Sequence, residues 1–173
     1  MITNEARDRV RGWFHGRLPE DWRSVDPEIT LDREEITVLL TIPDVELADG
    51  ASEAEAAEAR AGRVKAFREE TREHRISIAR EAEHRFDRKV SWGVTIGDRT
   101  ELFTHIAVPV MTRLRQPQRQ VLDTLVEAGV ARSRADALAW CVRLVGQHAD
   151  DWLAELRAAM SHVADVRTKG PAA

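Results

Sequence analysis

Five arginines between residues 106 and 134 form the part of this sequence with the clearest chemistry. Only two carboxylates accompany them, so the segment has an excess of three positive charges although the whole chain has a net charge of −4. These arginines are Arg113, Arg115, Arg119, Arg132 and Arg134. Guanidinium groups bind phosphate through paired hydrogen bonds, so a local cluster of this kind is typical of nucleic-acid contacts.

Other residue types with catalytic or metal-binding potential have simpler structural interpretations. Glu81 and His84 have the Glu-x-x-His spacing of a carboxylate-bridged metal site, but the sequence has no second motif of this kind. Cys141 lies in an apolar run, where a buried thiol is unreactive. We find no nucleophile elbow, zinc-protease motif or phosphate loop. We therefore expect no catalytic residue, no metal site, no cofactor and no enzymatic activity.

Length and composition predict one folded domain or two small ones. The chain has 173 residues, of which 43% are hydrophobic and 32% are charged. It has no apolar run long enough to span a membrane, and its first residues, MITNEARDRV, do not resemble a secretory signal. A single cysteine excludes an internal disulfide and fits a reducing compartment. We expect a cytoplasmic protein.

Hydrophobic periodicity predicts an α+β fold in the order α-β-β-α-β-β-α-α-α. We expect the four strands to form one antiparallel sheet, covered by the N-terminal helix and a long central helix. A helix as long as the central one needs a partner helix or a kink, which Gly62 favours. The expected helices are 3–16, 52–89, 117–129, 134–147 and 149–167, and the expected strands are 29–32, 36–42, 90–96 and 102–114.

The last of these strands has two different faces from residue 106 to residue 115. Alternation places Ile106, Val108, Val110, Thr112 and Leu114 on one face, and Ala107, Pro109, Met111, Arg113 and Arg115 on the other. The strand therefore presents two arginines opposite an apolar face. It pairs either with the same strand of a second chain or within its own chain.

Two helices follow this strand, and both have clear end signals. Pro117 suits the first turn of the first helix, and Gly129 suits its C-terminal end. In the sequence GVARSRADAL, residues 129–138, Ser133 and Asp136 form a capping pair for the second helix. The region after residue 105 is thus expected to be a strand, a helix, a short turn and a capped helix.

This order resembles the ribbon-helix-helix family of DNA-binding proteins over residues 105–145. The resemblance implies that two chains pair their strands into a ribbon that enters the major groove. Base contacts would come from Pro109, Met111 and Arg113. Contacts to the DNA backbone would come from Arg115, Arg119, Arg132, Ser133 and Arg134.

We therefore expect a homodimeric DNA-binding protein that acts as a transcriptional regulator. Residues 105–167 would form a ribbon-helix-helix-like region with an additional helix, and residues 168–173 a frayed tail. Residues 1–104 would serve in dimerisation, effector binding or partner binding. The alternative is a non-enzymatic interaction or scaffold protein that binds a protein partner through its long charged helix and an apolar stripe. The stripe is Trp152, Leu156, Met160 and Val163.

Overall fold

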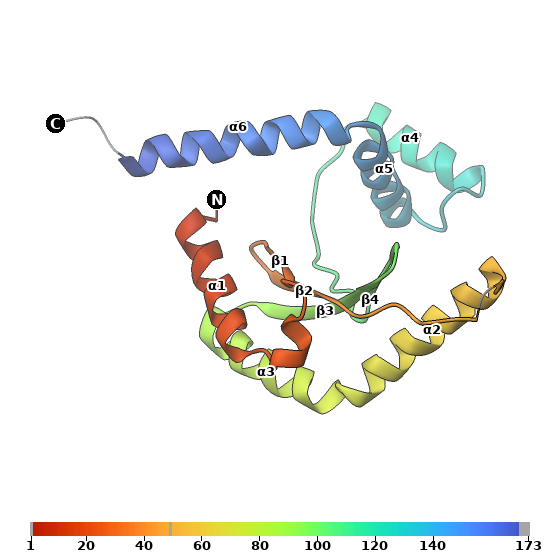
Figure 1. Cartoon of the computed structure of the whole chain (residues 1–173). Coiled ribbons are helices and arrows are strands. Elements are labelled where there is room, and N and C mark those ends of the chain that lie inside the picture. The colour runs from red at the N-terminus through yellow and green to blue at the C-terminus, as the bar shows by residue number, and fades with distance from the viewer. Residues whose placement is uncertain (1, 49, 170–173) are drawn as a thin grey trace. The chain divides into compact units, whose positions relative to one another are not determined.

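The chain divides between Pro109 and Val110 into two compact units. The computed structural model describes residues 2–48 and 50–169, and its mixture of helices and strands confirms the α+β class (Figure 1). The first unit contains α1 (Asn4–Arg17), the 3-10 helix η1 (Glu20–Arg23), β1 (Glu28–Leu31), β2 (Glu35–Thr41), α2 (Glu53–Glu70), α3 (Arg72–Phe86), β3 (Lys89–Ile96) and β4 (Arg99–Leu102). The second contains α4 (Gln116–Glu127), α5 (Arg134–His148) and α6 (Asp150–Lys169). The tail expected at 168–173 lies outside the described residues beyond Lys169.

The four strands form one sheet in the order β1-β2-β3-β4, and this sheet is mixed. The outer pairs are antiparallel, but β2 and β3 are parallel, with Ile36 opposite Val90 and Leu40 opposite Val94. The prediction of an antiparallel sheet was therefore wrong at the central pair. Helices α2 and α3 connect β2 to β3, and a helical crossover returns the chain to the sheet in the same direction.

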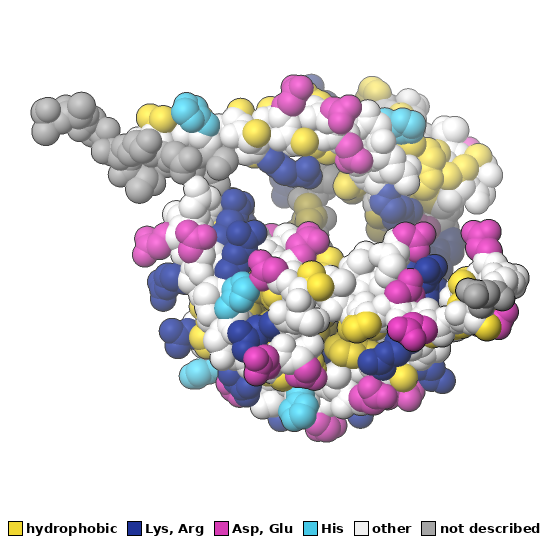
Figure 2. All heavy atoms as spheres, in the orientation of Figure 1, with side chains coloured by type: hydrophobic (Ala, Val, Ile, Leu, Met, Phe, Trp, Pro, Cys, Tyr) yellow, Lys and Arg dark blue, Asp and Glu magenta, His cyan; other side chains and the backbone are white. Residues whose placement is uncertain are grey.

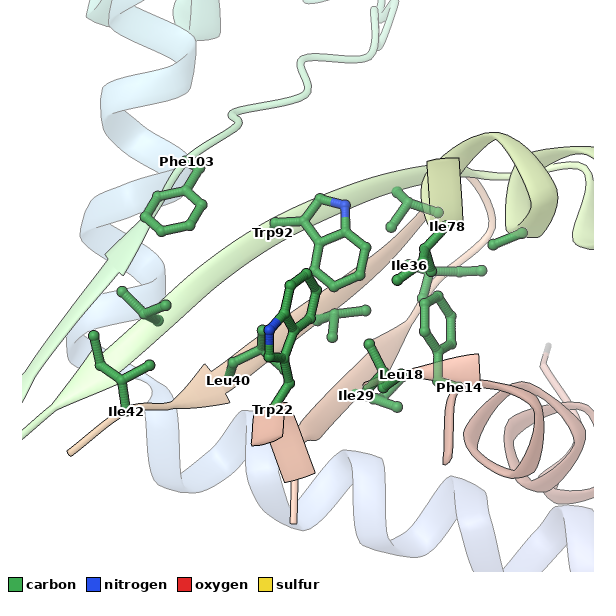
Figure 3. Close-up of a cluster of buried hydrophobic side chains, with 14 of the residues drawn as sticks. Phe14, Leu18, Trp22, Ile29, Ile36, Leu40, Ile42, Ile78, Trp92 and Phe103 are labelled. Carbon is green, nitrogen blue, oxygen red and sulfur yellow. The ribbon is translucent and has the colours of Figure 1, made fainter. Parts of the chain in front are cut away.

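The core of the first unit lies between one face of the sheet and the helices. Buried and half-buried residues alternate along β2, as expected for a strand with one face on the core. Aromatic rings join the layers: Trp92 of β3 lies 6.2 Å from both Phe14 of α1 and Trp22 of η1 (Figure 3). Edge-to-face packing of this kind adds to the hydrophobic gain from burial.

The long helix expected at 52–89 is two helices, and the break lies at Thr71 rather than near Gly62. The Thr71 hydroxyl donates to the carbonyl oxygen of Phe67 at 2.6 Å, and Arg75 Nη2 donates to the carbonyl oxygen of Arg68 at 2.6 Å. These side chains satisfy carbonyl groups at the end of α2 and so stabilise the break. Glycine alone gives no such bonds, and α2 continues unbroken through Gly62.

The strand expected at 102–114 is also different in the structure. β4 begins at Arg99 and ends at Leu102, and the Phe103 amide donates to the Trp92 carbonyl at 2.7 Å. From residue 104 to residue 114 the described backbone makes no backbone hydrogen bond, and the chain is extended without a strand partner. β3 extends beyond its Gly93–Leu102 pair to Lys89, but the chain leaves this strand after Phe103 and no longer pairs with it.

The second unit has a small core. Its buried side chains are Leu122, Ala131 and Ala137, against which Leu114, Leu125, Val126, Leu138 and Cys141 pack. Helices α4, α5 and α6 leave many apolar side chains exposed, among them Val121, Val142, Val145 and Trp152. None of the helices in the described part of the chain has the length and apolar composition needed to cross a membrane.

Candidate nucleic-acid interface

The turn between α4 and α5 folds as its residue types predict. Gly129 has φ +73°, the left-handed conformation that glycine adopts at little cost, and its amide donates to the carbonyl of Val126 at 3.0 Å. Ser133 is the N-cap of α5, because its hydroxyl accepts a hydrogen bond from the Asp136 amide at 3.2 Å. This turn fixes where α5 begins relative to α4.

Asp136 places a negative charge at the first turn of α5. Its carboxylate accepts a hydrogen bond from the Arg132 amide at 3.0 Å and lies 3.4 Å from Arg132 Nε. These hydrogen bonds from Arg132 hold the pKa of Asp136 below its ordinary value. The carboxylate therefore occupies the amide-rich end of α5, where the sequence predicted a phosphate contact at Ser133, and it partly neutralises Arg132.

Arg134 holds the two helices together. Its Nε and Nη2 donate to the two carboxylate oxygens of Asp123 at 2.6 and 2.7 Å, which is a bidentate pair between α5 and α4. This side-chain hydrogen bond lowers the pKa of Asp123. Sequence analysis missed the pair because the two residues lie eleven positions apart across a turn, outside the spacing of helical neighbours.

The extended segment 110–115 presents the remaining predicted residues to solvent. Met111 is 95% exposed and Val110 is 85% exposed, and the side chains of Arg113 and Arg115 are exposed as well. Among the described residues, no carboxylate forms an ion pair with Arg113 or Arg115. Two cations without internal partners thus lie directly before α4.

Pro109 and Arg119 differ from this pattern. Pro109 is exposed, but it is the last residue of the first unit. It therefore lies outside the second unit, which contains the segment 110–115 and the helices that follow it. Arg119 Nη1 donates to the carbonyl of Leu114 at 2.7 Å, which anchors the end of the extended segment to the first turn of α4. Arg119 has no carboxylate partner among the described residues, so its positive charge remains available to a ligand.

A shallow groove of about 350 Å³ separates the extended segment from the start of α5. Its lining is largely apolar, with one arginine from α4 and one from α5: Val110, Met111, Thr112, Leu114, Arg119, Leu122, Arg134, Ala135 and Leu138. An exposed apolar groove beside an extended chain without a strand partner is typical of a surface that binds another chain.

Charge is otherwise mixed in this protein. Figure 2 shows Lys and Arg side chains interspersed with Asp and Glu over the first unit. Glu81, which had metal-ligand spacing with His84, instead binds Arg17 with both oxygens at 2.6 Å. Cys141 is half-buried against the small core of the second unit, and the described residues hold no group of three metal-ligating side chains. The basic segment before α4 is thus the candidate site that sequence and structure share.

Comparison with protein families shows which family this is. Residues 8–102 match the model of the Rv1265-like protein N-terminal domain, and residues 115–167 match that of the Mb1296 C-terminal domain. The chain belongs to the Rv1265-like family. It is 62% identical over 159 residues to protein Rv1265 of Mycobacterium tuberculosis H37Rv and to protein Mb1296 of Mycobacterium bovis. Each match covers 92% of this chain and 69% of the relative.

These relatives are named only as uncharacterized proteins, so the relationship gives a family and no activity. No solved structure matches the chain. The resemblance to the ribbon-helix-helix family was wrong: the matching models are those of the Rv1265-like family, and none is a ribbon-helix-helix model. The resemblance was based on a glycine at the end of one helix and a serine cap at the start of the next, and these features occur between helices in many folds.

Proposed function

We propose that this protein is a homodimeric DNA-binding protein that regulates transcription in the cytoplasm. In this proposal, the segments 110–115 of two chains pair and present their arginines to the major groove. One observation supports it above all. From residue 110 to residue 114 the described chain is extended, largely exposed and makes no backbone–backbone hydrogen bond, and neither Arg113 nor Arg115 forms an ion pair with a described carboxylate. The proposal concerns the mechanism and does not depend on membership of the ribbon-helix-helix family.

Pairing follows from the physical chemistry of the segment. An exposed strand edge offers unpaired amide and carbonyl groups to another strand, and an identical segment in a second chain is always present at equal concentration. Pairing would cover Val110, and burial of a valine side chain is worth about 1.5–3 kcal/mol. The second unit gains most from this contact, because its own core holds only three buried residues among those described.

DNA is the ligand that best fits the exposed cations. Arg113, Arg115 and Arg119 lack carboxylate partners among the described residues, so a dimer would present six such guanidinium groups around one axis. Arg113 and Met111 would face base edges, and Arg115 and Arg119 would contact phosphates. Arg134 is engaged with Asp123, so we expect it to position α5 and to contribute less to binding.

The DNA test uses fluorescence anisotropy with the full chain and a labelled mixed-sequence duplex. Four phosphate contacts, from Arg115 and Arg119 of two chains, predict about a hundredfold loss of affinity between about 50 mM and about 200 mM salt. The double variant Arg113→Ala/Arg115→Ala should bind weakly and with a shallower salt dependence. Arg7→Ala/Arg11→Ala is the charge-matched control, because both are exposed arginines of α1 that form no ion pair among the described residues. The absence of binding at low salt would refute the proposal.

The dimer is tested separately by sedimentation velocity. Val110→Glu should yield a monomer, because it places a charge at the proposed strand pair while the single chain leaves that side chain in solvent. Val25→Glu, at a half-exposed valine of the first unit, should leave the dimer intact. A wild-type protein that is monomeric at micromolar concentration would contradict strand pairing.

The alternative function, binding of a protein partner, is favoured by one observation on α6. Trp152, Leu156, Met160 and Val163 lie at steps of three or four residues and are all exposed, with Trp152 at 58%. Such a stripe suits a second helix. If Trp152→Ser/Met160→Ser leaves both the dimer and DNA binding intact, α6 is free for a different partner. Loss of the dimer would place α6 in the dimer contact.

A further inference from the structure

A basic cavity of about 590 Å³ lies in the first unit, away from the proposed DNA-binding segment in the sequence. The C-terminal half of α2, the start of α3 and the end of β4 form its walls. Its lining contains four cations, two carboxylates and three other residues: Lys65, Arg68, Arg72, Arg75, Glu69, Glu101, Ile76, Phe103 and Thr104. A cavity of this size accommodates a small ligand.

Arg75 is a buried cation without a carboxylate partner. It is only 8% exposed, its Nε donates to Thr71 Oγ1 at 3.0 Å, and its Nη2 donates to the Arg68 carbonyl at 2.6 Å. Its guanidinium carbon lies 4.8 Å from the centre of the Phe103 ring. No described residue accepts a hydrogen bond from Nη1, and this nitrogen is not among the buried unpaired atoms, so it is accessible from the cavity that Arg75 lines. The cavity therefore has a cation that an anion would stabilise.

Two further arginines increase this need for an anion. Burial lowers the pKa of Arg75 below its ordinary value, and repulsion by Arg68 and Arg72 lowers it further. Arg68 stacks on the same ring, with its guanidinium carbon 5.6 Å from the centre of Phe103. Phe103 is itself buried in the core of the unit (Figure 3), so the ring that both guanidinium groups contact is held in place.

The acidic residues of the cavity do not neutralise these cations. Glu101 is paired with Arg99 at 3.0 Å, and no ion pair among the described residues involves Glu69. Lys65 and Arg72 likewise have no carboxylate within ion-pair distance in the described chain. Like-charged groups that gather around one cavity without partners raise each other's free energy, and a multivalent anion lowers it.

We propose that this cavity binds a phosphate-bearing small molecule through Arg68, Arg72 and Arg75. Phosphate fits better than a single carboxylate, because it has more than one negative charge near neutral pH and three acceptor oxygens for guanidinium forks. Phe103 orients the arginines, and Lys65 adds a cation at the rim. This site goes beyond the proposed DNA binding and does not depend on it, since none of its residues belongs to the second unit.

Isothermal titration calorimetry of the full chain with sodium pyrophosphate tests the proposal, with inorganic phosphate as the smaller probe. Pyrophosphate should bind, and Arg68→Gln/Arg72→Gln should weaken binding by about tenfold or more, since each lost charge-assisted hydrogen bond has about that effect. Both arginines have exposed side chains, so we expect the variant to fold. The matched control for the single substitution Arg72→Gln is Arg80→Gln. Arg80 is an exposed arginine of α3 outside the cavity, so this variant should bind pyrophosphate as the wild type does.

Three outcomes would overturn the proposal. The first is no binding of millimolar pyrophosphate by the wild-type protein. The second is equal weakening by Arg80→Gln and by Arg72→Gln, which would indicate nonspecific attraction to a basic helix. The third is loss of duplex binding in the Arg68→Gln/Arg72→Gln variant while its pyrophosphate binding stays equal to that of the wild type, which would make this cluster part of a DNA surface. Unchanged pyrophosphate binding by Arg113→Ala/Arg115→Ala would support a separate site, whatever the result for DNA.

Discussion

Gly93 is the position where the sheet tolerates a side chain least, and its replacement gives the sharpest stability prediction. In the register of the sheet, Gly93 of β3 lies between Leu39 of β2 and Leu102 of β4. A Cβ atom at this position would lie 2.6 Å from Leu39 Cδ2, 2.9 Å from Leu102 Cδ2 and 2.7 Å from the Glu101 carbonyl oxygen. The two leucine side chains can rotate away, but the carbonyl oxygen belongs to the neighbouring strand and cannot.

Gly93→Ala should therefore force β3 and β4 apart at the Gly93–Leu102 pair, which ends their paired segment. Overpacking of this kind costs about 1–3 kcal/mol. For a unit of about a hundred residues, a loss of about 2 kcal/mol lowers the melting temperature by about 10 °C. Leu39→Ala in the same chain should not restore the stability, because the contact with the Glu101 carbonyl remains.

Gly62→Ala is the matched control, because it makes the same chemical change in a helix. Nothing lies within 4 Å of a Cβ atom at Gly62, and α2 runs unbroken through this residue. Alanine there should stabilise the protein by about 0.5–1 kcal/mol. Thermal unfolding followed by circular dichroism measures both variants. Two results would refute the close approach of a Cβ atom at Gly93 to the Glu101 carbonyl oxygen. One is a Gly93→Ala variant as stable as wild type, and the other is a shift of stability in the same direction by both substitutions.

Three further substitutions test local contacts. Arg17 lowers the pKa of Glu81 through their side-chain hydrogen bond, so this carboxylate contributes stability above the ordinary glutamate pKa of about 4.3, and the contribution is lost as pH falls through the lower folded value. Glu81→Gln should therefore flatten the acid side of the urea-midpoint profile, and an unchanged profile would exclude the pair. Ser133→Ala should destabilise α5 by about 1 kcal/mol while Ser133→Asp retains the cap, as measured by urea unfolding. Gly129→Ala should cost about 1 kcal/mol because φ is positive there, and equal stability would argue against that conformation.

Local features of the fold were predictable because they depend on neighbouring residues. The turn from Gly129 to Ser133 is specified by a glycine that accepts a positive φ and a hydroxyl that reaches an amide three residues later. The parallel pair β2–β3 was not predicted, since strand direction depends on the path of the long connection between them. That connection does contain the signal, because two strands joined by a long helical crossover usually lie parallel.

The basic cavity was not predicted, although part of its signal is in the sequence. Lys65, Arg68, Arg72 and Arg75 follow each other at steps of three, four and three residues, which places them along one side of a helical path. In a segment dense with Glu and Arg, the same pattern is also typical of a solvated helix face with i,i+4 ion pairs. Phe103, the residue that orients two of these guanidinium groups, directly follows β4, and the rest of α3 and the strands β3 and β4 separate it from Arg75 in the sequence.

The arginines of this chain fall into two groups, those that bind a carboxylate and those that do not. The number of arginines and their positions in the sequence do not reveal to which group each belongs. Arg17 and Arg134 each bind one carboxylate with two nitrogens, and these pairs join α1 to α3 and α4 to α5. Such a pair satisfies the guanidinium and leaves little positive charge for a ligand. Arg75 and Arg113 have no such partner among the described residues, one buried against an aromatic ring and one exposed before α4. Because an arginine stays charged at any physiological pH, its remaining interaction must be with solvent or with an anion from outside the chain.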